Sequence, residues 1–225
     1  FQSFVSAGGP FDVAITVHQA PPPVFPFSLT DKPPDAGKTK VKEAFTNLPG
    51  GRLIRKRLTG LYFVTGGGIH LAVGPALENL NQVINFINSR FIEWRLDRGG
   101  LLCHAAAVSH NGQAIALAGL AGAGKSSLAM KIMASGETDF ISNDRVILAV
   151  ENGRTIAYGV AKQPRLNPGT LMNNPMLQGV LASEKAARYK ALPEHELRHL
   201  EDKHDLIIEK VFGKNRFRLC APLKG

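Results

Sequence analysis

Residues 119–126 read Gly-Leu-Ala-Gly-Ala-Gly-Lys-Ser, and this stretch decides the fold of the chain. It matches the pattern G-x-x-x-x-G-K-[ST] of a phosphate-binding loop, or P-loop. An apolar run at residues 113–118 precedes the loop and predicts a buried strand. Helix-forming residues 127–134 follow it, and Gly136 suits the end of a helix. The sequence therefore predicts a strand, a glycine-rich loop and a helix in succession.

This arrangement binds nucleotide phosphates for a physical reason. Small residues let backbone N–H groups approach the phosphates, and the following helix adds the positive end of its dipole. The side chain of Lys125 would reach the β- and γ-phosphates, and the Ser126 hydroxyl would bind Mg²⁺. The alternative is a glycine-rich turn that carries Lys-Ser by chance, but the flanking strand and helix argue against it. We expect the nucleotide, ATP, to contact Gly119, Gly122, Ala123, Gly124, Lys125, Ser126 and Ser127.

Composition places the chain among ordinary globular proteins. Its 225 residues are 44% hydrophobic and 20% charged, which is enough to bury a sizeable core. Cys103 and Cys220 lie far apart and form neither a disulfide framework nor a zinc-binding spacing, which predicts a reducing, cytoplasmic environment. No apolar run approaches the ~20 residues of a membrane helix, so we expect no membrane association.

The net charge of +9 suits phosphorylated or acidic ligands. Its densest cluster is Arg52, Arg55, Lys56 and Arg57. Because no aromatic residues interleave with these cations, the cluster indicates a solvated basic edge more than a site for single-stranded nucleic acid. Nucleic-acid binding is therefore supported by net charge alone.

The pattern along the chain predicts two regions, a small β-rich one at residues 1–75 and a P-loop core at residues 76–225. Strand-like residues 53–64 and 69–73 flank the glycines at 66–68. Proline-rich residues 20–36 predict an extended connector and not a packed element.

A long helix is expected after residue 76. We expect it to cover one face of the sheet that carries the P-loop. Its apolar positions recur at helical spacing and are Leu77, Leu80, Val83, Ile84, Ile87, Phe91 and Trp94.

Two hairpins are predicted around the dipeptides Asn111-Gly112 and Asn152-Gly153. Pairing about the first puts His104 opposite roughly Ala118, beside the loop. Pairing about the second puts Asn143 and Asp144 opposite Lys162 and Ala161, so Lys162 and Arg165 should return toward that end. Antiparallel hairpins beside a P-loop indicate a mixed sheet. Further strands are expected at residues 206–208 and 216–219.

Chemistry requires more than a P-loop, and three residues are candidates. Asp144 ends an apolar strand as a second Mg²⁺ ligand would, although such a residue can also cap a turn. His104 could act as an acid or base or contact a phosphate, although a lone histidine on an apolar strand is more often structural. Arg165 lies between prolines and could clamp the transferring phosphoryl group, or belong to a surface loop.

These motifs together resemble the HPr kinase/phosphorylase family, whose P-loop core is shared with PEP carboxykinase. The chain is most similar to the HPr-kinase-related proteins called HprK-related kinase B. Besides the P-loop, the resemblance rests on residues 102–107 (Leu-Cys-His-Ala-Ala-Ala), 142–145 (Ser-Asn-Asp-Arg) and 164–170 (Pro-Arg-Leu-Asn-Pro-Gly-Thr). Residues 201–205 are also similar. The resemblance is firm over residues 79–170 and fainter on both sides.

The resemblance implies phosphoryl transfer from ATP to a hydroxyl group, with Lys125 and Ser126 as nucleotide ligands and Asp144 on Mg²⁺. His104 matches the family's active-site histidine, and an oligomer would be consistent with the family. One position departs from the pattern, because the family's general base is an aspartate where this chain has Asn143. Three alternatives follow from Asn143 at the position of the general base. The chain could act on a different acceptor, His104 could act as the base, or a loose transition state could need little help from a base.

The sequence thus predicts an α/β protein with a mixed β-sheet P-loop kinase core of the HPr kinase/PEP carboxykinase type. Its leading function is an ATP- and Mg²⁺-dependent kinase, with His104, Lys125, Asn143, Asp144 and Arg165 as catalytic residues. Its acceptor would be a hydroxyl of a protein or small molecule. The alternative is a nucleotide-binding regulator with weak or no phosphoryl transfer, which Asn143 favours.

Overall fold

The computed structural model describes residues 8–34, 36–37, 39–120, 122–200 and 202–224, without the side chains of residues 198 and 199. The chain is a mixed α/β protein with several sheets and forms two compact units, Gly8–Phe91 and the chain from Ile92 onward. The division falls inside helix α1 (Leu80–Leu96), whereas the sequence placed the corresponding boundary after residue 75. Among the described helices, none is both long enough and apolar enough to span a membrane.

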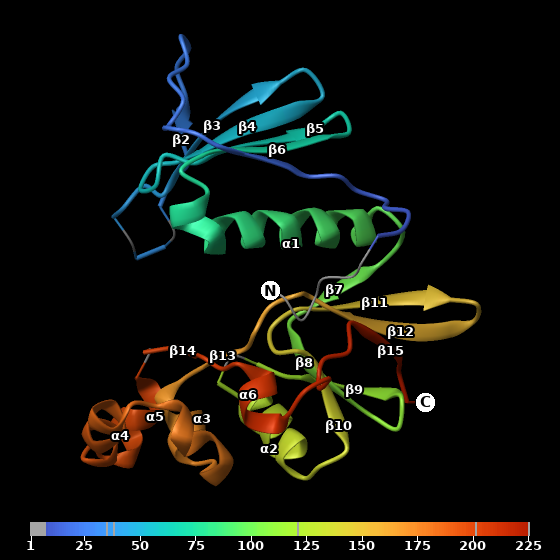
Figure 1. Cartoon of the computed structure of the whole chain (residues 1–225), viewed down its shortest axis with the longest axis vertical. Coiled ribbons are helices and arrows are strands. Elements are labelled where there is room, and N and C mark those ends of the chain that lie inside the picture. Colours follow the sequence, from blue (N-terminus) through green and yellow to red (C-terminus); the bar gives the residue numbers. More distant parts are fainter. Residues whose placement is uncertain (1–7, 35, 38, 121, 201, 225) are drawn as a thin grey trace. The chain divides into compact units, whose positions relative to one another are not determined.

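The first unit contains a six-stranded sheet in the order β1-β6-β5-β4-β3-β2 (Figure 1). Only the β1–β6 pair is parallel. The predicted glycine turn joins β5 to β6, because Gly66 pairs with Ile69 while Gly67 and Gly68 take the positive φ that glycine tolerates best. The strands are β1 (Thr16–Gln19), β2 (Thr30–Asp31), β3 (Glu43–Leu48), β4 (Gly51–Lys56), β5 (Tyr62–Gly66) and β6 (Ile69–Gly74).

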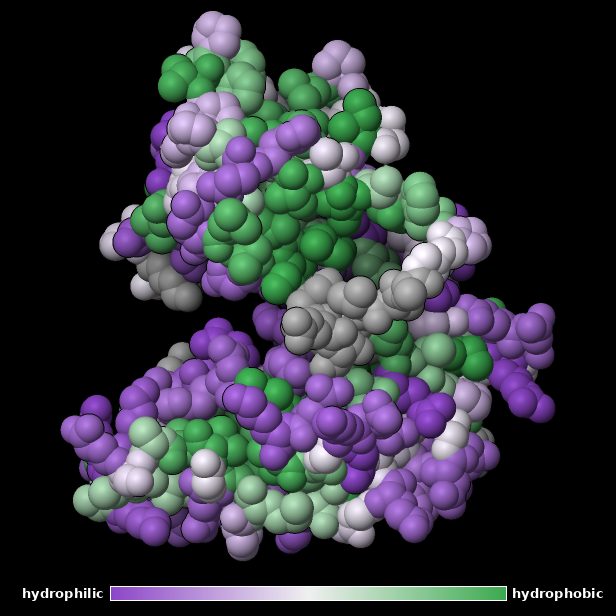
Figure 2. All heavy atoms as spheres, viewed as in Figure 1, coloured by the Kyte–Doolittle hydropathy of each residue, from purple (hydrophilic) through white to green (hydrophobic). Residues whose placement is uncertain are grey.

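Helix α1 packs on this sheet, and the expectation that it covers the P-loop sheet was wrong. Val83 and Phe86 belong to the same buried cluster as Leu61 and Phe63, and the Phe63 and Phe86 rings stack with centroids 4.5 Å apart. The reason is connectivity: only a short 3₁₀ turn (Leu77–Asn79) separates β6 from α1, so the helix folds back over its own sheet. Figure 2 shows hydrophobic residues gathered on the visible face of this unit.

The proline-rich connector is also packed, contrary to the sequence expectation. The Phe25 ring lies edge-on to Tyr62 with centroids 4.9 Å apart, and Phe25 stacks on Phe27 at 5.1 Å. Since neighbouring residues of a strand point to opposite faces, Tyr62 and Phe63 face opposite ways. The connector therefore covers the sheet face that α1 leaves open.

The second unit contains two larger antiparallel sheets, in the orders β10-β8-β9 and β15-β12-β11-β7, and a two-stranded antiparallel sheet, β13-β14. Both predicted hairpins are confirmed: His110 pairs with Gln113, and Glu151 pairs with Arg154. The named strands of the sheet that carries the P-loop pair antiparallel, because β8 lies between the two strands that α2 connects. Parallel contacts occur as well, as isolated bridges from Ala114 of β9 to Leu223 and from Phe140 of β10 to Phe217. The strands are β7 (Leu101–Cys103), β8 (Ala105–His110), β9 (Gln113–Ala118), β10 (Thr138–Ser142), β11 (Val146–Glu151), β12 (Arg154–Gly159) and β15 (Cys220–Pro222).

The two sheets stack through small buried side chains. Ala105 and Ala107 of β8 lie in one cluster with Ile141, Val146 and Ala157. After β15 the chain joins the sheets at one edge, where the Leu223 N–H donates to Thr155 and the Lys224 N–H donates to Ala114. The small alanine side chains of this cluster therefore let the two sheets pack closely.

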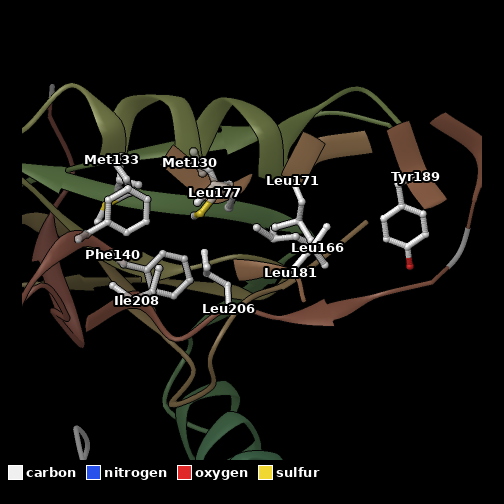
Figure 3. Packing of buried hydrophobic residues seen from close by; sticks show 14 of the residues in the cluster. Met130, Met133, Phe140, Leu166, Leu171, Leu177, Leu181, Tyr189, Leu206 and Ile208 are labelled. Carbon is white, nitrogen blue, oxygen red and sulfur yellow. The ribbon is translucent and has the colours of Figure 1, made fainter. Parts of the chain in front are cut away.

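The opposite face of the P-loop sheet is covered by α2 (Lys125–Ala134) and by the C-terminal elements. Figure 3 shows Met130 and Met133 pointing from α2 into the cluster that includes Phe140 and Leu177. The C-terminal elements are β13 (Arg165–Leu166), α3 (Pro168–Met172), a 3₁₀ helix (Pro175–Val180), α4 (Ser183–Lys190), α5 (Glu194–His199), β14 (His204–Asp205) and α6 (Ile208–Phe212).

The two strands expected near the C-terminus were wrong. Leu206 and Ile207 lie between β14 and α6, and Ile208 begins α6, where it and Phe212 are buried four residues apart on the inner side of the helix. Residues 216–219 contribute only an isolated bridge between Phe217 and Phe140, and the strand proper is β15. Short apolar runs of this kind do not distinguish a helix from a strand by themselves.

A partly buried polar cluster lies at one end of this core. The Tyr189 hydroxyl donates to Asp202 at 2.5 Å and lies 2.8 Å from Nε2 of His204. In Figure 3 the Tyr189 ring lies at the edge of the hydrophobic cluster. Burial, followed by the hydrogen bond to Asp202, raises the pKa of Tyr189 to about 12. The same hydrogen bond lowers the pKa of Asp202.

Replacing Tyr189 by phenylalanine should change the alkaline stability profile. The pKa of Tyr189 is raised in the folded state, so its stabilisation is complete below pH 10, the unfolded value, and is lost as the pH rises toward about 12. Urea unfolding between pH 8 and 12 should show a flatter decline for Tyr189→Phe, which should also lose about 1–2 kcal/mol at neutral pH. The two proteins share every other group that titrates at alkaline pH. Equal declines in their free energies of unfolding between neutral and alkaline pH would therefore contradict this prediction.

Candidate functional site

The P-loop has the backbone geometry of an anion-binding nest. Strand β9 ends at Ala118 and helix α2 begins at Lys125, as the sequence predicted. Between them Gly122 and Gly124 have φ of 79° and 81°, a left-handed conformation that turns successive N–H groups toward one side. Ala121, which also belongs to the motif, lies outside the described residues.

The N-terminus of α2 is electrostatically suited to a phosphate. The first turn of the helix carries no acidic residue, so no carboxylate of that turn competes for the positive end of the dipole. Ala129 and Met130, one turn further on, are buried against the sheet and hold the helix in place. The loop is therefore exposed while the helix that supports it is anchored.

Lys125 occupies the interior of its own loop. Its Nζ donates to the carbonyl oxygens of Gly119 and Leu120, at 2.8 and 3.0 Å. These carbonyls hold the ammonium group where the loop closes, and a phosphate has stronger acceptor oxygens than a carbonyl. Binding a nucleotide would thus exchange these two hydrogen bonds for contacts to phosphate.

The segment at residues 164–170 lies beside the loop, but through a residue that the sequence did not single out. Oγ of Ser127 and Oγ1 of Thr170 are 2.8 Å apart, which links the first turn of α2 to α3. Ser127 was expected to contact the nucleotide, and this hydroxyl is already engaged. The place of Thr170 at the end of the 164–170 motif was the only signal that could have predicted its position.

His104 and Asp144 are brought together at the start of the P-loop. His104 lies at the bend between β7 and β8, and Ala105 pairs with Ala118, one residue from the register that the sequence predicted. The His104 Nδ1 atom lies 3.1 Å from Oδ1 of Asp144 and 3.2 Å from its carbonyl oxygen. Both side chains are more than half exposed. The pair is therefore accessible to a ligand that binds at the loop.

Asn143 carries an amide oxygen that is buried and has no hydrogen-bond partner among the described residues. It lies in the bend after β10, which the Ser142 hydroxyl closes by donating to the Arg145 carbonyl at 2.6 Å. An unsatisfied buried acceptor costs about 1–3 kcal/mol, so a donor supplied by a ligand would be stabilised here. The bend places this amide next to Asp144 in the chain.

Arg165 does not join this group. Its Nε lies 3.0 Å from Oδ1 of Asp205, and its Nη2 donates to the Lys203 carbonyl at 3.5 Å. Within the described chain these are its polar partners, and they belong to β14 and its flank. The β13–β14 pairing directs Arg165 to Asp205, so the expectation that Arg165 returns to the Asp144 end stays a prediction. Glu201, in the neighbouring similar segment, is outside the described residues.

A magnesium ion fits the residues at the loop. The described part of the chain has no group of three His, Cys, Asp or Glu side chains suited to a metal. Mg²⁺ does not require one, because it is typically held by one or two protein ligands together with phosphate oxygens and water. Ser126, at the start of α2, and the exposed carboxylate of Asp144 are the donors available for this purpose.

Comparisons of the chain with models of protein families, with curated proteins and with solved structures find no match. The resemblance to HPr kinase-type proteins therefore stays an expectation from the sequence motifs. The structure places at the loop two glycines with left-handed backbone, a lysine, a serine at the start of α2, and a histidine–aspartate pair.

Proposed function

We propose that the chain is an ATP- and Mg²⁺-dependent phosphotransferase with a P-loop kinase core of the HPr kinase type. The observation that carries the proposal is the contact of His104 with Asp144 at the start of the P-loop. A P-loop by itself supports nucleotide binding, whereas transfer to an acceptor needs a group that handles the proton of the acceptor hydroxyl. A histidine oriented by a carboxylate is such a group.

The residues divide the work as follows. The acceptor oxygen forms a bond to the γ-phosphorus, the bond from that phosphorus to the bridging oxygen breaks, and ADP leaves. Lys125 and the loop N–H groups stabilise the charge on the phosphates. With Nδ1 of His104 held by Asp144, Nε2 of His104 remains to accept the acceptor's proton. Mg²⁺ at Ser126 and Asp144 would supply further charge neutralisation when bound.

The alternative function is a nucleotide-binding regulator without phosphoryl transfer. Asn143 favours it, because an amide cannot serve as a general base and Arg165 is engaged with Asp205. The two functions share ATP binding and differ in whether the γ-phosphoryl group of ATP is transferred to an acceptor.

Incubation with γ-labelled ATP, Mg²⁺ and a cell extract separates the two functions. A kinase should transfer label to an acceptor protein or metabolite, and the transfer should stop when EDTA removes Mg²⁺. Calorimetry with a non-hydrolysable ATP analogue measures binding in parallel. Saturable binding with no labelled acceptor would favour the regulator, and no binding at all would overturn both.

Replacing Asn143 by aspartate tests whether a missing base limits the reaction. The Asn143 amide oxygen is buried and unpartnered, so a carboxylate at this position should ionise at higher pH than an exposed one and be a stronger base. We expect Asn143→Asp to raise transfer by about tenfold or more, with a gain that grows as the pH increases. The check is the pH profile of initial rates. An unchanged or lower rate at every pH would mean that His104 already serves as the base.

A further inference from the structure

A cavity of about 170 Å³ lies in the first unit, between the proline-rich connector and the outer face of the sheet. The connector contributes Phe25 and Phe27, and the sheet side contributes Arg55, Arg57 and Tyr62. Tyr62 is buried, whereas Phe27 is 44% exposed, so the cavity has a closed floor and an open side. All of these residues belong to one compact unit and none is part of the P-loop.

Arg55 brings an uncompensated positive charge to this cavity. Its guanidinium carbon lies 5.7 Å from the centre of the Tyr62 ring, and its Nε is buried without a hydrogen-bond partner among the described residues. Neither a carboxylate nor a carbonyl of the described chain pairs with it. Arg55 as a whole is half-buried, and its buried Nε–H is a donor that an anionic ligand could satisfy.

The neighbouring arginine does not share this property. Arg57 donates from Nε to Oδ1 of Asp31 at 2.9 Å and forms an ion pair with the same oxygen through Nη2. Its charge is therefore already compensated. The cavity consequently carries one net positive charge, which calls for a ligand with a single anionic group.

Size and wall chemistry define the rest of the ligand. A cavity of about 150 Å³ lined by apolar side chains is known to hold benzene, so this one accommodates one ring with a small substituent. Three aromatic side chains surround the space, in edge-on and stacked pairs that leave ring faces and edges for a further ring. The planar fork of a guanidinium matches a carboxylate through two parallel hydrogen bonds.

We propose that this cavity is a binding site for a small aromatic carboxylate, with the ring between Phe25, Phe27 and Tyr62 and the carboxylate on Arg55. The sequence did not predict this cavity, because its residues are far apart in the chain. Arg55 lies in β4, whereas the aromatic residues come from the connector and from β5. The cluster at residues 52–57 is therefore more than a solvated basic edge: Arg55 and Arg57 line the cavity, and Arg55 is the one available to a ligand.

The probe for the test is benzoate, titrated into the full chain by calorimetry and by NMR of the aromatic side chains. We expect saturable binding with a dissociation constant of about 1 mM or lower. The ring signals of Phe25, Phe27 and Tyr62 should shift in the same titration. Benzyl alcohol, which lacks the charge, and acetate, which lacks the ring, should both bind more weakly than benzoate.

The variant Arg55→Gln should weaken benzoate binding by about ten- to a hundredfold, the loss of a charge-assisted pair. Arg52→Gln is the matched control, because Arg52 lies on the same strand but on the other face, 4.5 Å from the centre of the Phe45 ring. It should bind benzoate as the wild type does. Arg55→Lys, which keeps the charge but not the fork, should fall between the two.

Three results would overturn the proposal. One is the absence of saturable binding, with no shift of the aromatic signals in the wild-type protein. Another is equal benzoate affinity in Arg55→Gln and Arg52→Gln. The third is tighter binding of phenyl phosphate than of benzoate, which would assign the site to phosphate esters instead. Because the first readout uses the wild-type chain, it does not depend on whether a variant folds.

Discussion

Replacing Lys125 by alanine is expected to abolish phosphoryl transfer while leaving the fold intact. Among the described residues, the Lys125 ammonium group bonds to the exposed carbonyls of Gly119 and Leu120, which water can satisfy in its place. With ATP bound, the same group would contact the phosphates, and its loss should lower ATP affinity by about ten- to a hundredfold. The rate at saturating ATP should fall by a further factor of about 100, because the charge that develops during transfer loses a stabilising cation.

Lys131→Ala is the control for this experiment. Lys131 is an exposed lysine of the same helix, beyond its first turn, and its removal leaves the loop untouched. Calorimetry with ATP and the labelled-acceptor assay should show no change for Lys131→Ala, and both proteins should unfold at wild-type urea concentrations. Wild-type transfer by Lys125→Ala would exclude the P-loop as the site of chemistry.

Substituting Gly159 by alanine should produce the largest loss of stability. A Cβ at Gly159 would lie closer than 3.0 Å to the backbone carbonyl of Ile141, a separation that real Cβ atoms essentially never show. Gly159 belongs to β12 and Ile141 to β10, so the clash separates the two stacked sheets. Gly159 is held by its pairing with Val146, and Ile141 is buried between the sheets, so we expect a loss of at least about 2 kcal/mol in the free energy of unfolding.

Gly179→Ala provides the comparison, since a Cβ at Gly179 would meet nothing within 4 Å and the residue does not have a positive φ. Urea unfolding should show a change below about 0.5 kcal/mol for this variant. Gly159→Ala should also weaken ATP binding, because β10 leads directly into Asn143 and Asp144. Equal stability of the two variants would show that the sheets do not approach as closely as the structure indicates.

The candidate site shows which structural features the local sequence can predict. The spacing of Gly119, Gly124 and Lys125 specified a strand, a loop and a helix, and these lie where the motif placed them. The turn at Asn111-Gly112 set the register that brings His104 to the loop, to within one residue. Arg165 could not be placed in this way, because its partner Asp205 lies in a strand that no local pattern predicted.

What the sequence determined by itself is local: the strand–loop–helix order at residues 113–134 and the two hairpins. Their signals are residues that tolerate left-handed backbone, and Asn111 and Asn152 indeed have positive φ. Only the tertiary structure decided which sheet α1 covers, that Phe25 packs on Tyr62, and that Arg55 Nε is buried with no hydrogen-bond partner in the described part of the chain. The physical reason is that burial is non-directional: an apolar face specifies that it will be covered, but the covering segment is selected by packing across the whole chain.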